Sequence, residues 1–306
     1  MNNFGIAVHG GAGTLSAVEM TPQEEIIYRK ALETATMAGY DVLVKGGSSV
    51  EAVEAAVMAL ENEPLFNAGR GAVYTNSGKH EMDSCIMDGN TLKAGAITGI
   101  NNVKNPVSLA RTIMEQSEYV FLSGKGAEDF AHKMGLAFEP DEYFHTELRH
   151  GQWLAVKDTE EVLLDHKKVT KFGTVGAVAL DVHGNIAAAT STGGMTNKRY
   201  GRIGDSPIVG AGTYAKNNTC GISCTGHGEY FIRAVVAHNI SCLMEYKGLS
   251  LKEACNKVVM DDLVKMVGEG GLIAIDSQGN MELVFNSEGM YRGWKKNGEE
   301  LQTGIY

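Results

Sequence analysis

The sequence predicts an α+β fold in which two sheets of antiparallel β-hairpins carry helices on their outer faces. Residues 175–180 are apolar on both faces, as a strand buried between two layers is. A Gly-Asn turn at 184–185 leads into a second apolar run, and residues 270–285 repeat this hairpin pattern. Amphipathic segments with capping signals flank the hairpins along the chain, which places helices outside the sheets.

Capping signals mark the helices of the N-terminal half. Thr21 begins a capping box with Pro22 at the first helical position and Glu24 at the third, which predicts a helix to about residue 45. Ser48 or Ser49 caps a second, amphipathic helix. The other elements expected in this half are a strand at 4–8, a compact loop at 60–70, two or three strands within 72–100 with alternation at 72–74 and 94–100, and helices at 106–116 and 126–134.

The middle of the chain differs from its surroundings. Residues 136–172 are polar and of mixed charge, without clear periodicity apart from a short strand or helix within 152–164. This pattern is typical of an exposed, mobile linker, and it ends directly before Thr174. Further on, amphipathic helices are expected at 229–245 and from Ser250 to about residue 267.

The central hairpin brings hydroxyl groups together. Pairing of Asp181 or Val182 with Ile186 would set Thr174 opposite residue 193 or 194, inside the hydroxyl-rich run 190–194. A Gly-Thr pair at the start of a strand is common in purely structural settings. A buried strand that begins in this way beside several hydroxyls is also a suitable place for chemistry.

Composition excludes several classes of protein. With 43% hydrophobic residues and 38 glycines in 306 residues, the chain can fill a core that contains many tight turns. A net charge of −10 disfavours nucleic acid and anionic membranes as partners. The chain has no 18-residue apolar run, and its first residues lead into the first strand without a charged segment, so neither a membrane span nor a signal peptide is expected. Five scattered cysteines predict a cytoplasmic protein without disulfides.

Short motifs throughout the chain point to one family. They are VHGGAG (8–13), PLFNAGRGAV (64–73), GTVGAVALD (173–181), ATSTGGMTNK (189–198), GRIGDSP (201–207), SCTGHGE (223–229), EGMYRGW (288–294) and GIY (304–306). In these motifs the chain resembles the plant-type (class 2) L-asparaginases with isoaspartyl aminopeptidase activity, which are N-terminal nucleophile hydrolases. The resemblance covers nearly the whole chain and is weakest between about residues 110 and 172.

The resemblance implies a fold, an assembly and an activity. The fold is a four-layer αββα sandwich that forms one structural unit. An autocatalytic cut between Gly173 and Thr174 divides it into an α subunit, 1–173, and a β subunit, 174–306, and two cleaved protomers form an (αβ)₂ homodimer. The activity is hydrolysis of amide bonds in β-aspartyl dipeptides and in the side chain of L-asparagine, which releases L-aspartate.

A free N-terminal threonine suits this chemistry. A threonine hydroxyl is a poor nucleophile unless a base lies beside it. An α-amine has a pKa of roughly 7.7–8.0, against about 10.4 for lysine, so much more of it is unprotonated at neutral pH. If the chain is cut before Thr174, the amine of this residue supplies the base. The catalytic roles implied by the resemblance fall on Thr174 as nucleophile, Thr192 as the hydroxyl beside it, and Thr225 and Gly226 as donors to the oxyanion.

The substrate-binding residues are also implied by the resemblance. Arg202 is expected to bind the α-carboxylate and Asp205 the α-amine of the aspartyl group. On spacing alone, these two residues would be a weak surface ion pair, and Thr225-Gly226 would be a turn. Gly226 and Gly228 are expected to contact substrate through their backbone, and Asn67 to lie at the wall of the site.

No cofactor is expected for catalysis, but the resemblance implies a structural sodium ion. The ion would lie in the loop after the second helix, which composition alone describes as a helix end. Backbone carbonyls suit a hard cation. The expected carbonyls are those of Leu60, Glu61, Glu63, Phe66, Ala68 and Arg70.

Several alternatives remain open on sequence alone. His9-Gly10-Gly11 is similar to the oxyanion motif of α/β-hydrolases, although the chain has no G-x-S-x-G elbow. Cys220, Cys224 and His227 offer three ligands to zinc without a clear fourth. A glycosylasparaginase-like amidohydrolase and an unprocessed, non-catalytic binding protein are the other candidates. His227 is also a candidate border of the site, since its ring could face the pocket or pack away from it.

Overall fold

The computed structural model describes residues 3–13, 20–159 and 173–306. Its strands are β1 (Gly5–Gly13), β2 (Met82–Asp88), β3 (Ala94–Ile100), β4 (Phe121–Ser123), β5 (Val175–Leu180), β6 (Ile186–Thr192), β7 (Thr213–Ala215), β8 (Cys220–Gly226), β9 (Gly270–Asp276), β10 (Met281–Phe285), β11 (Gly289–Lys296) and β12 (Gln302–Gly304).

The helices are α1 (Pro22–Val44), α2 (Ser49–Asn62), α3 (Pro106–Gln116), α4 (Gly124–Lys133), α5 (Asp141–Phe144), α6 (Glu147–Val156), α7 (Gly228–Ala234), α8 (Val236–Lys247) and α9 (Leu251–Asn256). A 3₁₀ turn (Gly69–Gly71) follows α2, and a π-helical segment (Lys257–Leu263) continues α9. None of the helices in the described parts of the chain combines the length and the apolar character that crossing a bilayer requires.

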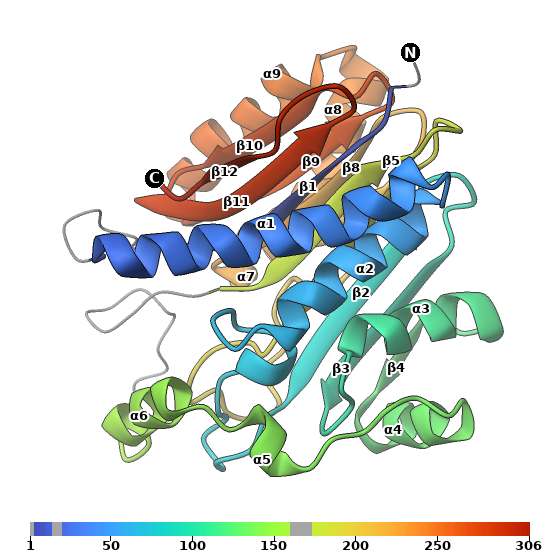
Figure 1. Cartoon of the computed structure of the whole chain (residues 1–306). Coiled ribbons are helices and arrows are strands. Elements are labelled where there is room, and N and C mark those ends of the chain that lie inside the picture. Colours follow the sequence, from blue (N-terminus) through green and yellow to red (C-terminus); the bar gives the residue numbers. More distant parts are fainter. Residues whose placement is uncertain (1–2, 14–19, 160–172) are drawn as a thin grey trace.

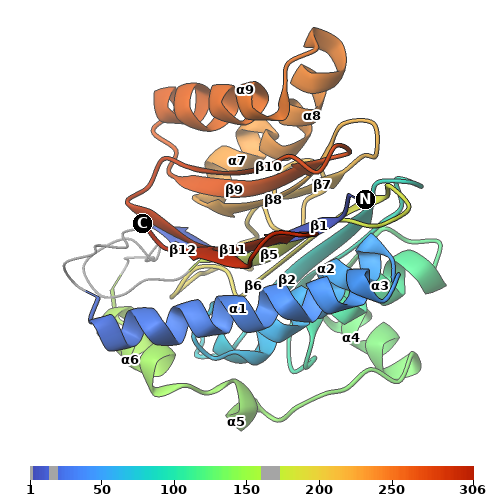
Figure 2. The ribbon, with the colours of Figure 1, turned by 45° about the horizontal axis from the view of Figure 1, so that its top comes forward.

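Two sheets pack face to face and helices cover both outer faces. The larger sheet has eight strands in the order β12-β11-β1-β5-β6-β2-β3-β4, and the smaller has four in the order β10-β9-β8-β7. Figure 2 shows α1 to α3 against the larger sheet and α8 and α9 against the smaller one. The chain therefore adopts the four-layer αββα sandwich, and the α+β prediction is confirmed.

Apolar side chains fill the three spaces between the layers. One cluster joins α1, α2 and α3 to the larger sheet, and a second joins α8 and α9 to β8 and β9. The third lies between the two sheets and includes Val178 of β5 and Ile273 and Ile275 of β9. Every residue of β5 is buried, as the apolar pattern on both of its faces predicts.

The register of the β5–β6 hairpin differs from the predicted one. Leu180 pairs with Ile186 and Val175 with Ser191, so continuing the pairing by one residue sets Thr174 opposite Thr192. The difference arises in the turn, where Asp181 pairs through its backbone with Asn185 instead of Ile186. The Asp181 carboxylate holds this turn because its Oδ1 accepts the N–H groups of His183 and Asn185.

The predicted helix starts are confirmed where a capping box marks them. Thr21 and Glu24 form the reciprocal box at the start of α1, and Ser48 forms one at the start of α2. Ser250 does the same for α9. The helix expected at 229–245 is instead divided into α7 and α8 at Val235, whose φ of 48° lies in the left-handed region.

The linker predicted at 136–172 is wrong for residues 141–156, although the end of α6 overlaps the short strand or helix expected within 152–164. Residues 141–156 contain α5 and α6, and Arg149 of α6 is fully buried, where its Nε donates to the Gly71 carbonyl at 2.9 Å. One buried side chain thus anchors a segment whose composition is that of an exposed loop. Residues 160–172 lie outside the described part of the chain.

Smaller differences concern strands. Residues 72–74 form no strand, because Val73 N–H donates to the Asn67 side chain and the Tyr74 carbonyl accepts from Asn197. The first strand is longer than expected, since β1 continues past a register shift between His9 and Gly11 to Gly13. All five cysteines are free, as their scattered positions predict.

Candidate active site

A small cavity of about 30 Å³ lies at the start of β5. It is bordered by segments that are far apart in the sequence, which meet because β1, β5 and β6 are neighbours and β8 packs across them. The lining residues are Ala12, Gly173, Thr174, Thr192, Gly194, Met195, Arg202, Gly204, Asp205, Ser206 and Gly226. Most of the predicted catalytic and substrate-binding residues therefore surround one space.

The Thr174 hydroxyl lies at the centre of a hydroxyl cluster. Its Oγ1 donates to Thr192 Oγ1 at 3.1 Å and lies 3.3 Å from Ser206 Oγ. Thr192 Oγ1 also accepts the N–H of Gly194 at 3.0 Å, which fixes its orientation. Thr174 is only 8% exposed, so this hydroxyl is shielded from bulk water.

The Gly173 backbone is packed between β1 and β8. A methyl group built on Gly11, which has a φ of +111°, would lie 2.5 Å from the Gly173 nitrogen. A methyl group on Gly173 would lie 2.9 Å from Thr225 Oγ1. Thr225 is fully buried, and its Oγ1 accepts the Ala12 N–H at 3.3 Å. The predicted oxyanion donor thus lies directly beside the peptide that precedes Thr174.

Arg202 is held by an acidic residue that the sequence analysis did not identify. Its Nε and Nη2 donate to the two carboxylate oxygens of Glu229, each at 2.9 Å. Such a bidentate pair fixes both the position and the plane of the guanidinium group. Arg202 therefore pairs with Glu229, and the interpretation of Arg202 and Asp205 as a surface ion pair is wrong.

Asp205 is buried at the same cavity. Burial raises the pKa of its carboxyl to about 7, although its own backbone N–H and Arg202 lower it. Its Oδ2 has no hydrogen-bond partner within the part of the chain that the structure describes. A methyl group on Gly228 would lie 2.9 Å from the Asp205 nitrogen and 3.0 Å from Arg202 Nη2. Gly228 therefore leaves space for both charged groups.

A second polar network supports the strands under the cavity. His9 Nε2 lies 2.9 Å from Ser223 Oγ, which lies 2.7 Å from Thr190 Oγ1, and Thr213 donates to Thr190 at 2.6 Å. Burial lowers the pKa of His9 to about 3, so its ring is neutral. Because His9 and the glycines after it are part of β1, they form no α/β-hydrolase oxyanion loop.

Asn67 supports the wall of the site without lining the cavity. Its Nδ2 donates to the Gly194 carbonyl at 2.7 Å, and its Oδ1 accepts the Val73 N–H at 3.0 Å. Its backbone carbonyl accepts from Gly193 at 3.1 Å. Asn67 thus fixes the chain directly after Thr192.

The loop predicted to bind sodium is compact, and backbone carbonyls pack closely against its glycines. A methyl group on Gly69 would lie 2.5 Å from the Glu61 carbonyl oxygen, and one on Gly71 would lie 2.0 Å from the Phe66 carbonyl oxygen. The last carbonyls of α2 lie at the C-terminal end of the helix, which is the negative end of its dipole and therefore favours a cation. The donor chemistry of the loop therefore fits a hard cation.

His227 and the two nearby cysteines do not border the cavity. His227 Nε2 lies 3.3 Å from Glu229 Oε2, and its ring contacts Tyr230 edge-on with ring centroids 4.6 Å apart. His227 therefore lies beside Glu229, the partner of Arg202, and is not among the residues that line the cavity. Cys220 and Cys224 are fully buried in the apolar core under α8, where burial raises the pKa of both thiols, and this does not favour the zinc alternative.

Ser206 and Glu229 are polar residues at the site that escaped sequence reasoning. Ser206 directly follows Asp205 in the GRIGDSP motif. A hydroxyl group next to a predicted substrate-binding residue could have indicated its place at the site. Glu229 ends the SCTGHGE motif, but nothing in the sequence indicates that it reaches Arg202, 27 residues away along the chain.

Comparison with known proteins shows the family to which the chain is related. The family model described as asparaginase matches residues 2–305. An isoaspartyl peptidase of Salmonella typhimurium is 52% identical, over 100% of this chain and 99% of its own length. An isoaspartyl peptidase of Escherichia coli is 53% identical over 98% of this chain and 95% of its own, and a probable isoaspartyl peptidase/L-asparaginase of Arabidopsis thaliana is 42% identical over the whole of both. The chain belongs to the asparaginase family.

Proposed function

We propose that this chain is a self-processing threonine hydrolase that cleaves β-aspartyl dipeptides and the side-chain amide of L-asparagine to release L-aspartate. The observation that carries the proposal is the position of Thr174. Its hydroxyl lies within hydrogen-bond distance of Thr192 and Ser206, and the same cavity is lined by Arg202 and Asp205. The names and the identity of the relatives agree with an amide-bond hydrolase.

The self-processing step begins with the Thr174 hydroxyl. Its oxygen attacks the carbonyl carbon of Gly173, the peptide bond to the Thr174 nitrogen breaks, and the hydroxyl proton moves to that nitrogen. The resulting ester is hydrolysed by water, which gives a Gly173 carboxylate and a free Thr174 amine. The cavity beside Gly173 is only about 30 Å³, so we expect it to admit an amino acid only after the cut.

Turnover then repeats this chemistry on the substrate. The free amine of Thr174 takes the hydroxyl proton, the oxygen attacks the amide carbonyl, and the amine or ammonia leaves with a proton. Thr225 and the Gly226 N–H donate to the negative oxygen that develops on the carbonyl. Water hydrolyses the aspartyl ester and restores the Thr174 hydroxyl.

The charged residues supply recognition. Arg202, oriented by Glu229, binds the α-carboxylate of the aspartyl group. Asp205 binds the α-ammonium through its unpartnered Oδ2, which gains the hydrogen bond it lacks in the described structure. Gly226 lines the cavity, and Gly228 lies against Asp205 and Arg202 without a side chain that would crowd them.

The remaining expectations form part of the same proposal. We propose a structural sodium ion held by the carbonyls of the loop after α2, and no cofactor in catalysis. A cytoplasmic location is supported by the free cysteines.

We also propose that cleaved protomers associate as an (αβ)₂ homodimer. A glycosylasparaginase-like activity is less well supported, because Gly173 precedes the nucleophile where those enzymes carry aspartate.

A substrate panel tests the proposed activity. We expect hydrolysis of β-Asp-Leu and of asparagine, and none of N-acetyl-β-Asp-Leu, which lacks the ammonium that Asp205 binds. Arg202→Ala should lower kcat/KM by about 10²-fold or more, because a charged contact and its orientation are both lost. Arg233→Ala, which removes a cation that lies over the Tyr230 ring, serves as the control. Efficient hydrolysis of the acetylated peptide would refute this assignment.

A further inference from the structure

A group of metal-ligating side chains lies away from the cavity at Thr174. His145 precedes α6, and Glu147 and His150 lie three residues apart on its first turn, so they share one face of the helix. One ligand atom from each of the three residues lies within 4.8 Å of the others. His145 Nε2 and Glu147 Oε1 are 3.5 Å apart. The three residues occupy the sequence pattern H-x-E-x-x-H.

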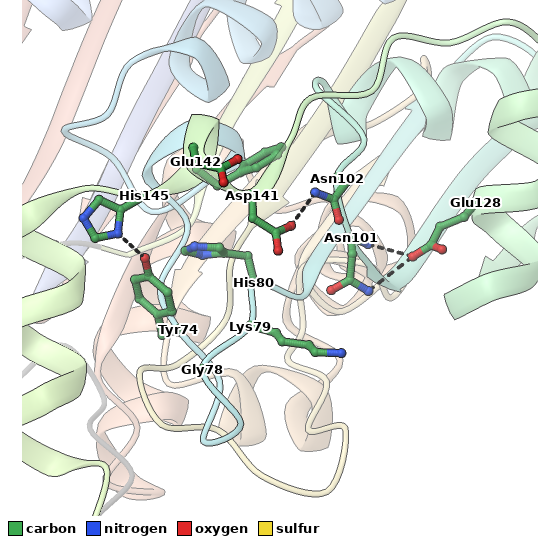
Figure 3. A pocket seen from close by; sticks show the side chains of 11 residues that line it. Tyr74, Gly78, Lys79, His80, Asn101, Asn102, Glu128, Asp141, Glu142 and His145 are labelled. Carbon is green, nitrogen blue, oxygen red and sulfur yellow. Dashed lines mark hydrogen bonds between the residues drawn. The ribbon is translucent and has the colours of Figure 1, made fainter.

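The orientation of His145 is set by a buried tyrosine. Tyr74 is 7% exposed, and its hydroxyl lies 2.8 Å from His145 Nδ1 at the edge of a cavity of about 500 Å³ (Figure 3). With Nδ1–H donating to the tyrosine oxygen, the lone pair of the opposite nitrogen, Nε2, is available to a metal. His150 packs against Tyr74 and Trp153, with both pairs of ring centroids 5.8 Å apart.

The helix that carries the other two ligands is firmly attached to the body of the protein. Thr146 caps its start by accepting the Arg149 N–H, and Arg149 binds the Gly71 carbonyl. At its other end, Asn197 Nδ2 donates to the Val156 carbonyl at 3.0 Å. The backbone that positions the cluster is therefore fixed, and only the three ligand side chains, which are at least partly exposed, need to move for an ion to bind.

We propose that His145, Glu147 and His150 bind one divalent transition-metal ion of the Zn²⁺ type. Two imidazole nitrogens and one carboxylate oxygen are ligands that zinc accepts, and three protein ligands leave a fourth position for water. Ligand atoms around tetrahedral zinc lie roughly 3.3 Å apart, from bonds of about 2.0–2.1 Å. The observed separations, all within 4.8 Å, therefore close by small rotations of side chains that are at least partly exposed.

The charge of the cluster favours the same conclusion. With neutral histidines the three ligands carry one negative charge, on a chain whose net charge is −10. Both the local and the overall charge attract a dication. The site is independent of the proposed hydrolase activity, since none of its residues lines the cavity at Thr174.

Calorimetric titration of ZnCl₂ into the purified, tag-free full chain tests the site. We expect one ion per chain, and a rise in Tm with Zn²⁺ because the ion binds the folded state. The double variant His145→Gln, His150→Gln should lose at least about 10²-fold in affinity, and Tyr74→Phe should lose roughly 10- to 100-fold because the ligand is no longer oriented.

A matched control separates this site from other surface histidines. His183 lies exposed in the β5–β6 turn, so His183→Gln should bind Zn²⁺ as the wild type does. The ligand histidines are at least partly exposed, and the Tm of the double variant without metal should equal that of the wild type. Wild-type affinity in the double variant, or no binding by the wild type up to about 1 mM Zn²⁺, would overturn the proposal.

Discussion

Asp205 is a buried carboxyl group whose protonation affects folding. Burial raises its pKa from 3.8 to about 7, with the charge of Glu229 acting in the same direction. Between these two pH values the folded chain binds more protons at this group than the unfolded chain does. Its contribution therefore lowers the free energy of unfolding as the pH rises from about 4 to about 7, and the loss is complete above that range.

Replacing Asp205 with a neutral isostere should remove this loss. In a Thr174→Ala background, which keeps a single chain, Asp205→Asn should raise the free energy of unfolding by a few kcal/mol at pH 8 and by much less near pH 4. Urea unfolding at both pH values measures the difference. Asp41→Asn, at an exposed position in α1, is the control. A gain that is equal at the two pH values would contradict the account.

Single residues of the site were predictable to different degrees. Thr174 and Thr192 could be placed near each other because they belong to one hairpin, although the register was offset by the turn at Asp181. Glu229 could not be assigned to Arg202, because that contact depends on how α7 and the loop before β7 pack. Local pairings are visible in a sequence, whereas contacts between distant segments depend on the tertiary fold.

The break between α7 and α8 positions a helix against the site. Beyond Val235, the N–H of His238 donates to the Gly210 carbonyl at 2.8 Å and that of Ala237 to the Ala211 carbonyl at 3.2 Å. These carbonyls satisfy donors that the start of α8 would otherwise leave unpaired. They belong to the loop that also carries Asp205, so a straight helix over 229–245 would lose this support.

Val235 carries the strain of this break. A branched side chain in the left-handed region costs roughly 1–2 kcal/mol, and Val235 is 45% exposed, so little burial is lost on truncation. Val235→Gly should therefore raise the free energy of unfolding by about 1 kcal/mol. Val264→Gly, at a similarly exposed position with φ −59°, should lower it. The same sign for both variants in urea unfolding would refute the strain argument.

Elements with local signals were predicted well and the others were not. The capping boxes at Thr21, Ser48 and Ser250 depend on neighbouring residues, so they located α1, α2 and α9. The first half of α6 was missed because its main anchor, Arg149, is a charged residue that is buried only through tertiary contacts. Polar composition alone therefore predicted a linker where residues 147–156 form a packed helix.

At the scale of the whole molecule, strand β5 lies inside the four-layer sandwich. β5 lies between β1 and β6, and Val178 in its middle belongs to the cluster between the two sheets. A cut directly before it leaves the sandwich connected through these strands, so the subunits 1–173 and 174–306 would stay together as one structural unit. The four layers themselves followed from the family resemblance, because hairpin patterns alone do not specify how sheets stack.

Assembly is a prediction at this scale. The proposed (αβ)₂ homodimer should have a mass of about twice the 32.8 kDa of one chain. Light scattering at micromolar protein concentration measures it, with the Thr174→Ala chain as the comparison that separates assembly from cleavage. A mass near that of one chain for the cleaved protein would contradict the dimer.

Intact-mass spectrometry of the purified protein tests the central claim, which is that Thr174 becomes an N-terminal nucleophile. Wild-type protein should give two polypeptides, 1–173 and 174–306, whereas Thr174→Ala should give one chain of full length, because the attacking hydroxyl is absent. Hydrolysis of β-Asp-Leu should appear only in samples that contain the two polypeptides. A wild-type chain that stays whole and still hydrolyses this peptide would contradict the account.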